Sequence, residues 1–426
     1  MNNLIFISDE LPSNDNILDR FKRIKNSHDK ETFIDYICKT NSSIESHTFY
    51  TQLNVLMTIP EEKYFVFYES SNFYNSMLKL TTDSNYKKIV DDMRNDLCKV
   101  ILFTPEIMEG DYRPNSSLFN ITDILNNNNI SSKNVKYIIF EAIINKEKKA
   151  FELKGEYITH NRCANNIYSA HNHMVDKTFF HILDNSRNYY RKYKYISFNN
   201  AVKDHRFELL KYLNRENLLK FGLTSWFTGE DSGLTSSIFD VYDNMDKFTN
   251  EEKTMFDVYD SKYKFTDEEK KLIGNKGDLK VLGLQDYLNI VPHFDCYFNI
   301  VTESAWGPGY DNTLPQKIMI TEKVWKPIIS FQPFVLISTK NSLNKLREWG
   351  FKTFDGFIDE SYDELNTYEE RKKIIYSEIK RLCSKSIEEL DDWYWEMEDI
   401  LKYNYNYFFN TFIIDEHKKL EDFLKW

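Results

Sequence analysis

Two lysines near the start of a predicted helix form the most chemically suggestive pattern in the sequence. In the string ITEKVWKPI, Lys323 and Lys326 are three residues apart, so on a helix they share one face. Thr321 is a residue type that caps helix starts, which places both lysines in or near the first turns. The free backbone amides of a helix start attract anions. Two ammonium groups beside such a start could hold a diphosphate without a metal ion.

A predicted buried strand ahead of this helix carries a second set of polar residues. The string YFNIVTES (297–304) is an apolar run that delivers Thr302 and Glu303 at its carboxyl end. Open α/β sheets bind ligands at the carboxyl ends of their strands. We therefore expect Glu303 or Glu322 to accept hydrogen bonds from ribose hydroxyls or from a sugar. A plainer alternative is that Glu322 and Lys326 form an i,i+4 pair on a solvated face, worth only about 0.2–0.5 kcal/mol.

These strings resemble a glycosyltransferase family of phages, large viruses and bacteria that is related to the α-1,3-fucosyltransferases. In that family a strand ending in Glu is followed by a TEK helix, as in 297–304 and 320–328 here. A second motif, an Asn-containing turn followed by an HR pair, is matched by YISFNNAVKDHRFELL. The likeness covers roughly residue 98 to the end of the chain and is strongest over 293–363.

The resemblance implies a binding site for a nucleotide-sugar donor. Its predicted donor-binding residues are Asn199, His205, Arg206, Thr302, Glu303, Thr321, Glu322, Lys323 and Lys326. The sequence departs from the family at 200–204 (NAVKD), which replaces the basic run that commonly precedes the HR pair. One or two phosphate contacts expected there are missing, so the resemblance does not fix which sugar nucleotide binds.

The resemblance also implies a GT-B architecture, in which two Rossmann-like domains face each other. The donor nucleotide would bind to the C-terminal domain and the acceptor to the N-terminal one. The chain contains no Asp-x-Asp motif, which metal-dependent GT-A enzymes use to hold a divalent cation. We therefore expect no metal and no other cofactor, with lysine and arginine side chains and a helix dipole stabilising the leaving diphosphate.

An inverting glycosyltransferase also needs a base that deprotonates the acceptor hydroxyl. The resemblance points to Glu109, which forms a Glu-Gly pair with Gly110 in VILFTPEIMEGDY. Glu69, directly after the strand-like run YFVFY, is the substitute candidate. For either carboxylate taken alone, a surface residue without a catalytic role is the competing interpretation.

A polar, His- and Asn-rich connector is expected over 151–190, and it contains a cluster of possible metal ligands in the string THNRCANNIYSAHNH. It contains His160, Cys163, His171 and His173. These types suit zinc, but their spacing matches no standard structural zinc site, so we favour a loop without metal.

Strand-like apolar runs alternate with helix-like segments along most of the chain, which predicts an α/β fold with parallel sheets. The expected strands are LIFIS (4–8), YFVFY (64–68), VILF (100–103), VKYIIF (135–140), YKYISF (193–198), CYFNIVT (296–302) and PFVLIS (333–338). We expect an N-terminal acceptor domain over 1–180 and a donor domain over 181–365. A 17-residue acidic repeat lies in an insertion at 230–275, to which we assign no chemistry.

The last predicted part is a helical tail over 366–426, without Gly or Pro, that packs across both domains. Its many aromatic residues include Trp393, Tyr394, Trp395, Tyr403, Tyr405, Tyr407, Phe408 and Phe409. They would surround much of a helix, so core packing is favoured over a surface that stacks on carbohydrate.

Composition excludes several classes of protein. The chain has 426 residues and a formal net charge of −11, with 66 acidic against 55 basic residues, so it would be repelled by nucleic acid and by anionic membranes. Its five widely spaced cysteines fit reduced, mostly buried thiols. No apolar run is long enough to span a bilayer, and we expect a cytoplasmic protein.

The sequence therefore predicts an inverting, metal-independent glycosyltransferase that moves a sugar from a nucleotide donor, such as GDP-fucose, to a hydroxyl acceptor such as a glycan. Two alternatives stay open. One is a phage-type transferase that glycosylates DNA bases, against which the net charge counts. The other is a non-catalytic GT-B scaffold that binds a glycan or a protein.

Overall fold

The computed structural model describes residues 3–8, 47–49, 63–69, 73–103, 121–140, 156–161, 163–164, 167–168, 178–199, 203–226, 291–304, 306 and 318–423. The chain forms two compact units. Unit 1 comprises Met1–Asn166 together with Ile414–Trp426, and unit 2 comprises Ile167–Ile413. Unit 2 thus begins ahead of the boundary that we expected at residue 180.

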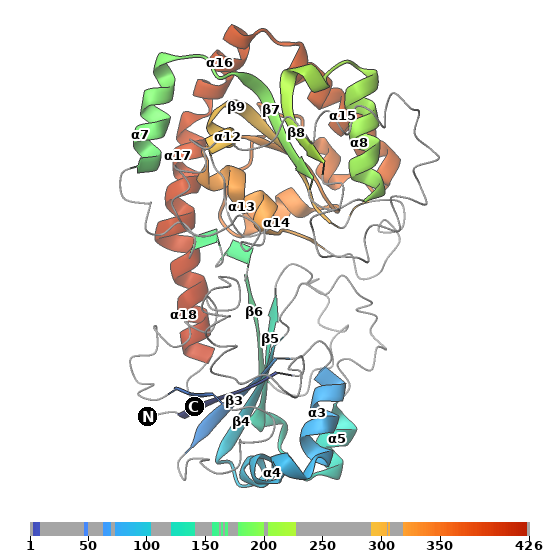
Figure 1. Ribbon diagram of the computed structural model, residues 1–426, viewed down its shortest axis with the longest axis vertical. Helices are drawn as coiled ribbons and strands as arrows, with labels where there is room; N and C mark the ends of the chain where they lie inside the picture. Colours follow the sequence, from blue (N-terminus) through green and yellow to red (C-terminus); the bar gives the residue numbers. More distant parts are fainter. Residues whose placement is uncertain are drawn as a thin grey trace. The chain divides into compact units, whose positions relative to one another are not determined.

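Unit 1 is built on a parallel sheet of six strands in the order β2-β1-β3-β4-β5-β6. The strands are β1 (Asn3–Ser8), β2 (His47–Phe49), β3 (Tyr64–Glu69), β4 (Cys98–Phe103), β5 (Val135–Phe140) and β6 (Glu156–His160). Three helices of this unit follow strands of the sheet (Figure 1): α3 (Phe73–Thr82), α4 (Lys87–Arg94) and α5 (Thr122–Asn127).

The central strands of unit 1 are apolar because parallel strands are covered on both faces. Val66, Val100, Leu102 and Tyr137 are fully buried and pack with the inner faces of the helices. β6, with the string EYITH, lies in a stretch that the sequence suggested was a polar connector. That interpretation was wrong, because a short edge strand needs little apolar character on its exposed side.

The end of the chain belongs to unit 1. Helix α18 (Ile413–Phe423) is held there by Lys136 of β5, which is 2% exposed and donates from Nζ to the backbone oxygen of Phe423 at 2.6 Å. Glu416 of the same helix accepts from the backbone amide of Asn161 at 2.8 Å.

Unit 2 is built on a second parallel sheet, in the order β10-β9-β7-β8. Its strands are β7 (Tyr193–Asn199), β8 (Gly222–Trp226), β9 (Cys296–Thr302) and β10 (Phe334–Ile337). The helices are α7 (Thr178–Asn185), α8 (Asp204–Arg215), α12 (Val291–Phe294), α13 (Glu322–Ile329), α14 (Ser342–Glu348), α15 (Tyr368–Ser384), α16 (Ile387–Glu396) and α17 (Glu398–Tyr407). A π-helical turn, Phe408–Phe412, follows α17.

Helices pack against this sheet in two groups. α15 lies against β7 and β10 and next to α8, where the Tyr212 hydroxyl donates to the backbone oxygen of Tyr376 at 2.8 Å (Figure 1). α13 packs against β9 and α17. Trp325 of α13 is fully buried, with ring centroids of Phe351 and Phe412 each 5.3 Å away.

Several aromatic residues of the helical tail are buried, while the packing between domains that the sequence suggested for them stays a prediction. Trp393, Tyr394, Tyr405 and Phe408 are buried, and the tail helices α15, α16 and α17 belong to unit 2. The four described cysteines are free, and three of them are buried. With two parallel-sheet units and a helical C-terminal segment, the chain has the α/β fold class expected from its sequence, while the GT-B arrangement stays a prediction.

Candidate active site

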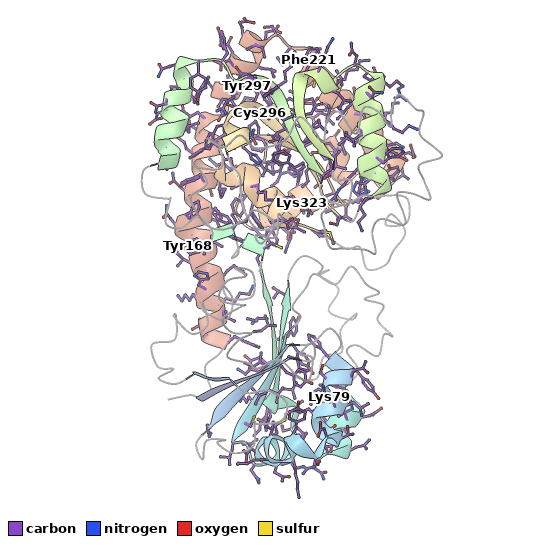
Figure 2. The ribbon with its side chains drawn as sticks, in the orientation of Figure 1. Lys79, Tyr168, Phe221, Cys296, Tyr297 and Lys323 are labelled. Carbon is purple, nitrogen blue, oxygen red and sulfur yellow. The ribbon has the colours of Figure 1, made fainter. Side chains whose placement is uncertain are left out.

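The strand order of unit 2 defines where a ligand would bind. β7 and β9 are neighbours, but the chain leaves them in opposite directions, through α8 to β8 on one side and through α13 to β10 on the other. Open α/β sheets bind ligands at such a switch point, beyond the carboxyl ends of the strands. Lys323 lies at this end of the sheet, whereas Cys296 and Tyr297 mark the opposite end of β9 (Figure 2).

Side chains join the two strand ends at the switch point. The Thr302 hydroxyl donates to Asn199 Oδ1 at 2.8 Å, and Asn199 Nδ2 donates to Ser197 Oγ at 3.3 Å. Asn199 and Thr302 are each 1% exposed. Both were predicted to bind the donor, and the structure brings them together as the buried floor of the site.

The start of α8 is tied to the end of β9. His205 Nε2 lies 2.8 Å from the backbone oxygen of Glu303, and because a carbonyl can only accept, this nitrogen carries the proton. Arg206, 1% exposed, donates from Nη2 to the backbone oxygen of Thr302 at 3.0 Å. The HR pair that the resemblance singled out therefore fixes the strand end from within the unit.

Burial sets the charge of this region. Burial, reinforced by the positive charge of Arg206, lowers the pKa of His205 to about 3. The imidazole is therefore neutral near pH 7. It acts as a fixed hydrogen-bond donor there and adds no positive charge to the site.

Glu303 and Thr321 connect β9 to α13. Glu303 is completely buried, and its Oε1 and Oε2 accept from the backbone amide and the hydroxyl of Thr321 at 2.6 and 2.7 Å. Thr321 is the N-cap of α13, as predicted, and its hydroxyl oxygen accepts from the backbone amide of Lys323. Both carboxylate oxygens of Glu303 thus contact the cap of α13, and its expected ligand contact stays a prediction.

Lys323 is the centre of the charged layer above this floor. Its Nζ lies 3.0 Å from Thr321 Oγ1, 2.9 Å from Glu322 Oε1 and 3.7 Å from Glu303 Oε2. Lys326 is on the same helix face but lies in the last turn of this eight-residue helix, not at its start. The predicted pair of lysines therefore contributes one cation to the helix start.

The carboxylates beside Lys323 have opposite pKa shifts. Burial raises the pKa of Glu303, although Lys323 and the hydrogen bonds from Thr321 oppose this. Burial also opposes the charge of Glu322, but Lys323 and Lys326 outweigh it and lower the pKa of Glu322 to about 2. For Lys323, burial is outweighed by Glu322 and Glu303, so the pKa of the ammonium is raised. Lys323 and Glu322 are therefore charged near pH 7.

Exposure separates two layers in the site. Glu303, Arg206 and His205 are nearly inaccessible, whereas the side chains of Lys323 and Glu322 are 22% and 15% exposed. A ligand at the switch point would meet the ammonium and carboxylate of the upper layer.

Sequence reasoning missed Trp306 in this site. Its ring stands edge-on to His205 with centroids 5.7 Å apart, and lies 4.5 Å from the ring of Tyr368. It is 3% exposed and covers the neutral imidazole. The available signal was its place three residues after Glu303 in the string ESAW.

Several other predicted features lie wholly or partly outside the described residues. Glu109, Gly110 and the repeat at 239–270 lie outside the described residues. Glu69 ends β3 in unit 1, where only its backbone is described. The candidate base stays a prediction.

No metal site is found among the described residues, where no three His, Cys, Asp or Glu side chains gather around one point. Of the connector cluster, Cys163 is half-buried and His160 ends β6, while His171 and His173 are not described. Within the same described portion, no helix is long and apolar enough to cross a membrane.

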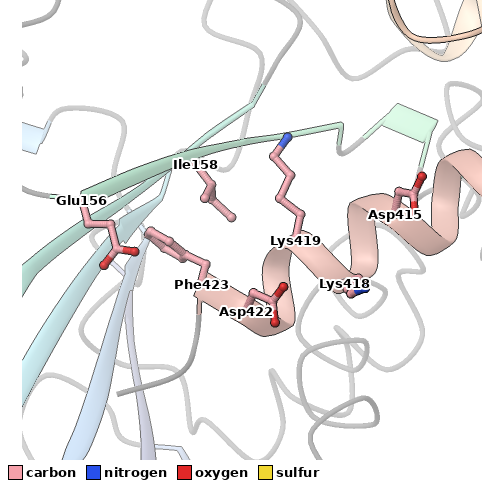
Figure 3. Close-up of a pocket in the computed structure, with 7 residues that line it drawn as sticks. All are labelled: Glu156, Ile158, Asp415, Lys418, Lys419, Asp422 and Phe423. Atoms are coloured by element: carbon pink, nitrogen blue, oxygen red, sulfur yellow. The ribbon is translucent and has the colours of Figure 1, made fainter.

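Unit 1 carries a separate open hollow of about 450 Å³ between β6 and α18 (Figure 3). It is lined by Glu156, Ile158, Asp415, Lys418, Lys419, Asp422 and Phe423. Acidic and basic side chains are mixed in it, and none of the predicted site residues takes part.

Comparisons with known proteins give distant likenesses only. No protein-family model and no curated protein matches the chain. The similar solved structures include the α,α-trehalose 6-phosphate synthase of Burkholderia multivorans, with 8% identity, a TM-score of 0.40 and coverage of 100% of both chains. The α,α-trehalose-phosphate synthase (UDP-forming) of Burkholderia vietnamiensis has 8% identity, a TM-score of 0.38 and coverage of 98% of this chain and 99% of that one.

A third similar structure is the N-terminal domain of trehalose-6-phosphate phosphatase from Candida albicans. It is 10% identical, with a TM-score of 0.36 and coverage of 98% of this chain and 97% of the other. Likenesses this distant decide neither the activity nor the substrate of the chain.

Proposed function

We propose that this chain is a glycosyltransferase that moves a sugar from a nucleotide-sugar donor to a hydroxyl acceptor, with inversion and without a metal ion. The observation that carries the proposal is the place of Lys323, in the first turn of α13 beside the sheet's switch point. The TEK helix that resembles the fucosyltransferase-related family thus starts where an α/β sheet binds its ligand.

The charges of the upper layer suit the leaving group. Departure of a nucleoside diphosphate adds negative charge to a phosphate oxygen while the sugar acquires oxocarbenium character. Lys323 is charged and accessible, so its ammonium is our candidate for stabilising that charge. Lys326 is half-buried and lies one turn further along the same face, where it adds positive potential.

Glu322 is our candidate for the ribose contact. Its carboxylate stays ionised because the lysines lower its pKa to about 2, so it can accept hydrogen bonds from two hydroxyls. In this proposal the donor is GDP-fucose or another nucleoside diphosphate sugar, and the acceptor is a glycan or another hydroxyl compound.

The first test is thermal unfolding of the full chain with UDP, GDP, CMP and dTDP. A nucleotide at 100 times its dissociation constant stabilises the protein by about 2.7 kcal/mol. Lys323→Met should weaken binding of the preferred nucleotide by about 10- to 100-fold, because a charged hydrogen bond is lost. Lys373→Met, which changes an exposed lysine of α15, is the matched control and should bind normally.

Turnover separates an enzyme from a binding scaffold. Release of the nucleotide from its sugar conjugate in the presence of acceptor glycans would support the transferase. Binding without release from any donor would favour the non-catalytic scaffold, and absence of binding to every nucleotide would overturn the proposal.

A further inference from the structure

We infer that Glu303 is a positioning residue, which orients Lys323 through Thr321 and does not itself contact the ligand. This inference rests on the proposed function only for the identity of the anion that Lys323 binds. It departs from the expectation that Glu303 accepts hydrogen bonds from ribose or sugar hydroxyls.

Both carboxylate oxygens of Glu303 are engaged by Thr321 and closed to solvent. Its Oε1 takes the Thr321 amide at 2.6 Å and its Oε2 takes the Thr321 hydroxyl at 2.7 Å. The residue is 0% exposed. A ribose hydroxyl could reach it only by displacing the cap of α13.

The backbone of Glu303 holds two further elements. Its amide donates to the backbone oxygen of Ile337 in β10 at 2.9 Å, and its carbonyl accepts from His205 of α8. One residue therefore ties β10, the start of α8 and the start of α13 to the end of β9. The starts of both helices at the switch point depend on it.

The hydroxyl of Thr321 connects the carboxylate of Glu303 to the ammonium of Lys323. A hydroxyl has one proton to donate, and Thr321 gives it to Glu303. One lone pair of Thr321 Oγ1 accepts from the backbone amide of Lys323, and the other is left for the Lys323 ammonium, 3.0 Å away. Without Glu303, that hydroxyl could rotate and the ammonium would lose a fixed acceptor.

The test uses inorganic pyrophosphate, which has no ribose, beside GDP and UDP. Calorimetric titrations compare the wild type with Glu303→Ala and Glu303→Gln. If Glu303 acts through Lys323, Glu303→Ala lowers the affinity for pyrophosphate and for the preferred nucleotide by the same factor, about 10-fold. Gln has one oxygen and can accept from only one of the two Thr321 groups, so it should restore only part of that loss. Glu360→Ala removes a buried carboxylate elsewhere in unit 2 and should leave both affinities unchanged.

A ribose contact would give a different result. Glu303→Ala would then lower the affinity for the nucleotide at least 10-fold and leave the affinity for pyrophosphate unchanged. That result would overturn the inference. A double variant adds a second check, because Thr321→Val breaks the same relay. The double variant should bind pyrophosphate less than about twofold more weakly than Thr321→Val alone does. A further 10-fold loss of affinity would contradict the relay.

Amide hydrogen exchange separates this inference from the proposed function. If the wild type binds neither pyrophosphate nor any nucleotide, the proposed function fails. Glu303→Ala should still speed exchange at the amides of 321–324 by at least about 10-fold, while Glu360→Ala should not. Unchanged exchange at those amides would refute the positioning role whatever binds.

Discussion

The imidazole of His205 lies 2.8 Å from the backbone oxygen of Glu303, although the two residues are 98 positions apart in the sequence. The bond requires a proton on Nε2, and burial next to Arg206 keeps the ring from taking a second one. The start of α8 is thus held by a neutral donor whose protonation would leave a cation buried in the unit.

This arrangement predicts that unit 2 loses stability in mild acid. The folded-state pKa is about 3 for His205 and about 4 for His293, both lowered mainly by burial from an ordinary value of 6.5. Below about pH 6.5 these histidines are protonated in the unfolded chain and stay neutral in the folded one. The free energy of unfolding is therefore highest above about pH 6.5 and decreases below it. Each histidine should lower the free energy of unfolding at pH 5 by about 2 kcal/mol relative to pH 7.

The measurement is urea unfolding at pH 7 and pH 5, followed by tryptophan fluorescence. His205→Gln keeps an amide donor and does not titrate, so its acid-induced loss should be smaller than that of the wild type by about 2 kcal/mol. An identical loss in the two proteins would mean that His205 is not the group that titrates.

Lys136→Met should release the end of α18 from unit 1. The substitution removes a bond of 2.6 Å to the backbone oxygen of Phe423 and an ion pair of 3.0 Å with Glu156, and it leaves a buried carbonyl unpaired. We expect a loss of about 1–3 kcal/mol, together with faster amide exchange over the last turn of α18. Lys133→Met is the matched control, since that lysine is 64% exposed and pairs only with Asp96 at the surface.

For the control we expect a change within about 0.5 kcal/mol. Equal effects of the two substitutions would show that the buried bond adds nothing to the docking of α18.

Gly350→Ala should destabilise unit 2 more than Gly356→Ala. Both glycines have positive φ angles, +92° and +88°, so an alanine at either position pays the cost of a left-handed backbone, about 1–2 kcal/mol. At Gly350 the added Cβ would also stand 2.3 Å from the hydroxyl of Tyr407, whereas at Gly356 it meets nothing within 4 Å. Overpacking adds about 1–3 kcal/mol.

Chemical denaturation of the two variants measures the difference directly. Gly350 ends α14 with the amide of Phe351 bonded back to Leu346, a turn that sets Phe351 against Trp325. Equal losses of stability in the two variants would mean that the ring of Tyr407 moves aside without a measurable loss of stability.

Strands with long apolar runs were predictable, and short polar ones were not. YFVFY is an unbroken apolar string and CYFNIVT is apolar except for Asn299 and Thr302, because parallel central strands are buried on both faces. β8 (GLTSW) and β6 (EYITH) lie at sheet edges, where half of the side chains can be polar, and neither was predicted. Each of these strands pairs with a segment distant in the sequence, so the local composition does not predict it.

The structure brings together side chains that the sequence singled out, but their contacts with one another were not predictable. The cap Thr321 followed from local chemistry, since a threonine before Glu-Lys marks a helix start. That Glu303 turns toward this cap depends on how β9 and α13 meet in space. A sequence string shows the carboxylate and leaves its direction open, which is why a ligand contact was expected.

Glu322→Gln should affect the binding of pyrophosphate and of the nucleotide to a different extent in the proposed site. The carboxylate of Glu322 neutralises Lys323 across 2.9 Å, so its removal should tighten pyrophosphate binding by about 2- to 5-fold, the worth of a partly exposed ion pair. The same change replaces an ionised ribose acceptor with a weaker amide oxygen, so the preferred nucleotide should lose part or all of that gain.

Calorimetry with pyrophosphate and the nucleotide measures both effects, with Glu369→Gln as the control because that carboxylate is 71% exposed and pairs with Lys372 on α15. If Glu322→Gln instead weakens pyrophosphate, the carboxylate must orient Lys323 more than it neutralises it. Its role would then resemble the one inferred for Glu303, and the ribose contact would have to come from another residue.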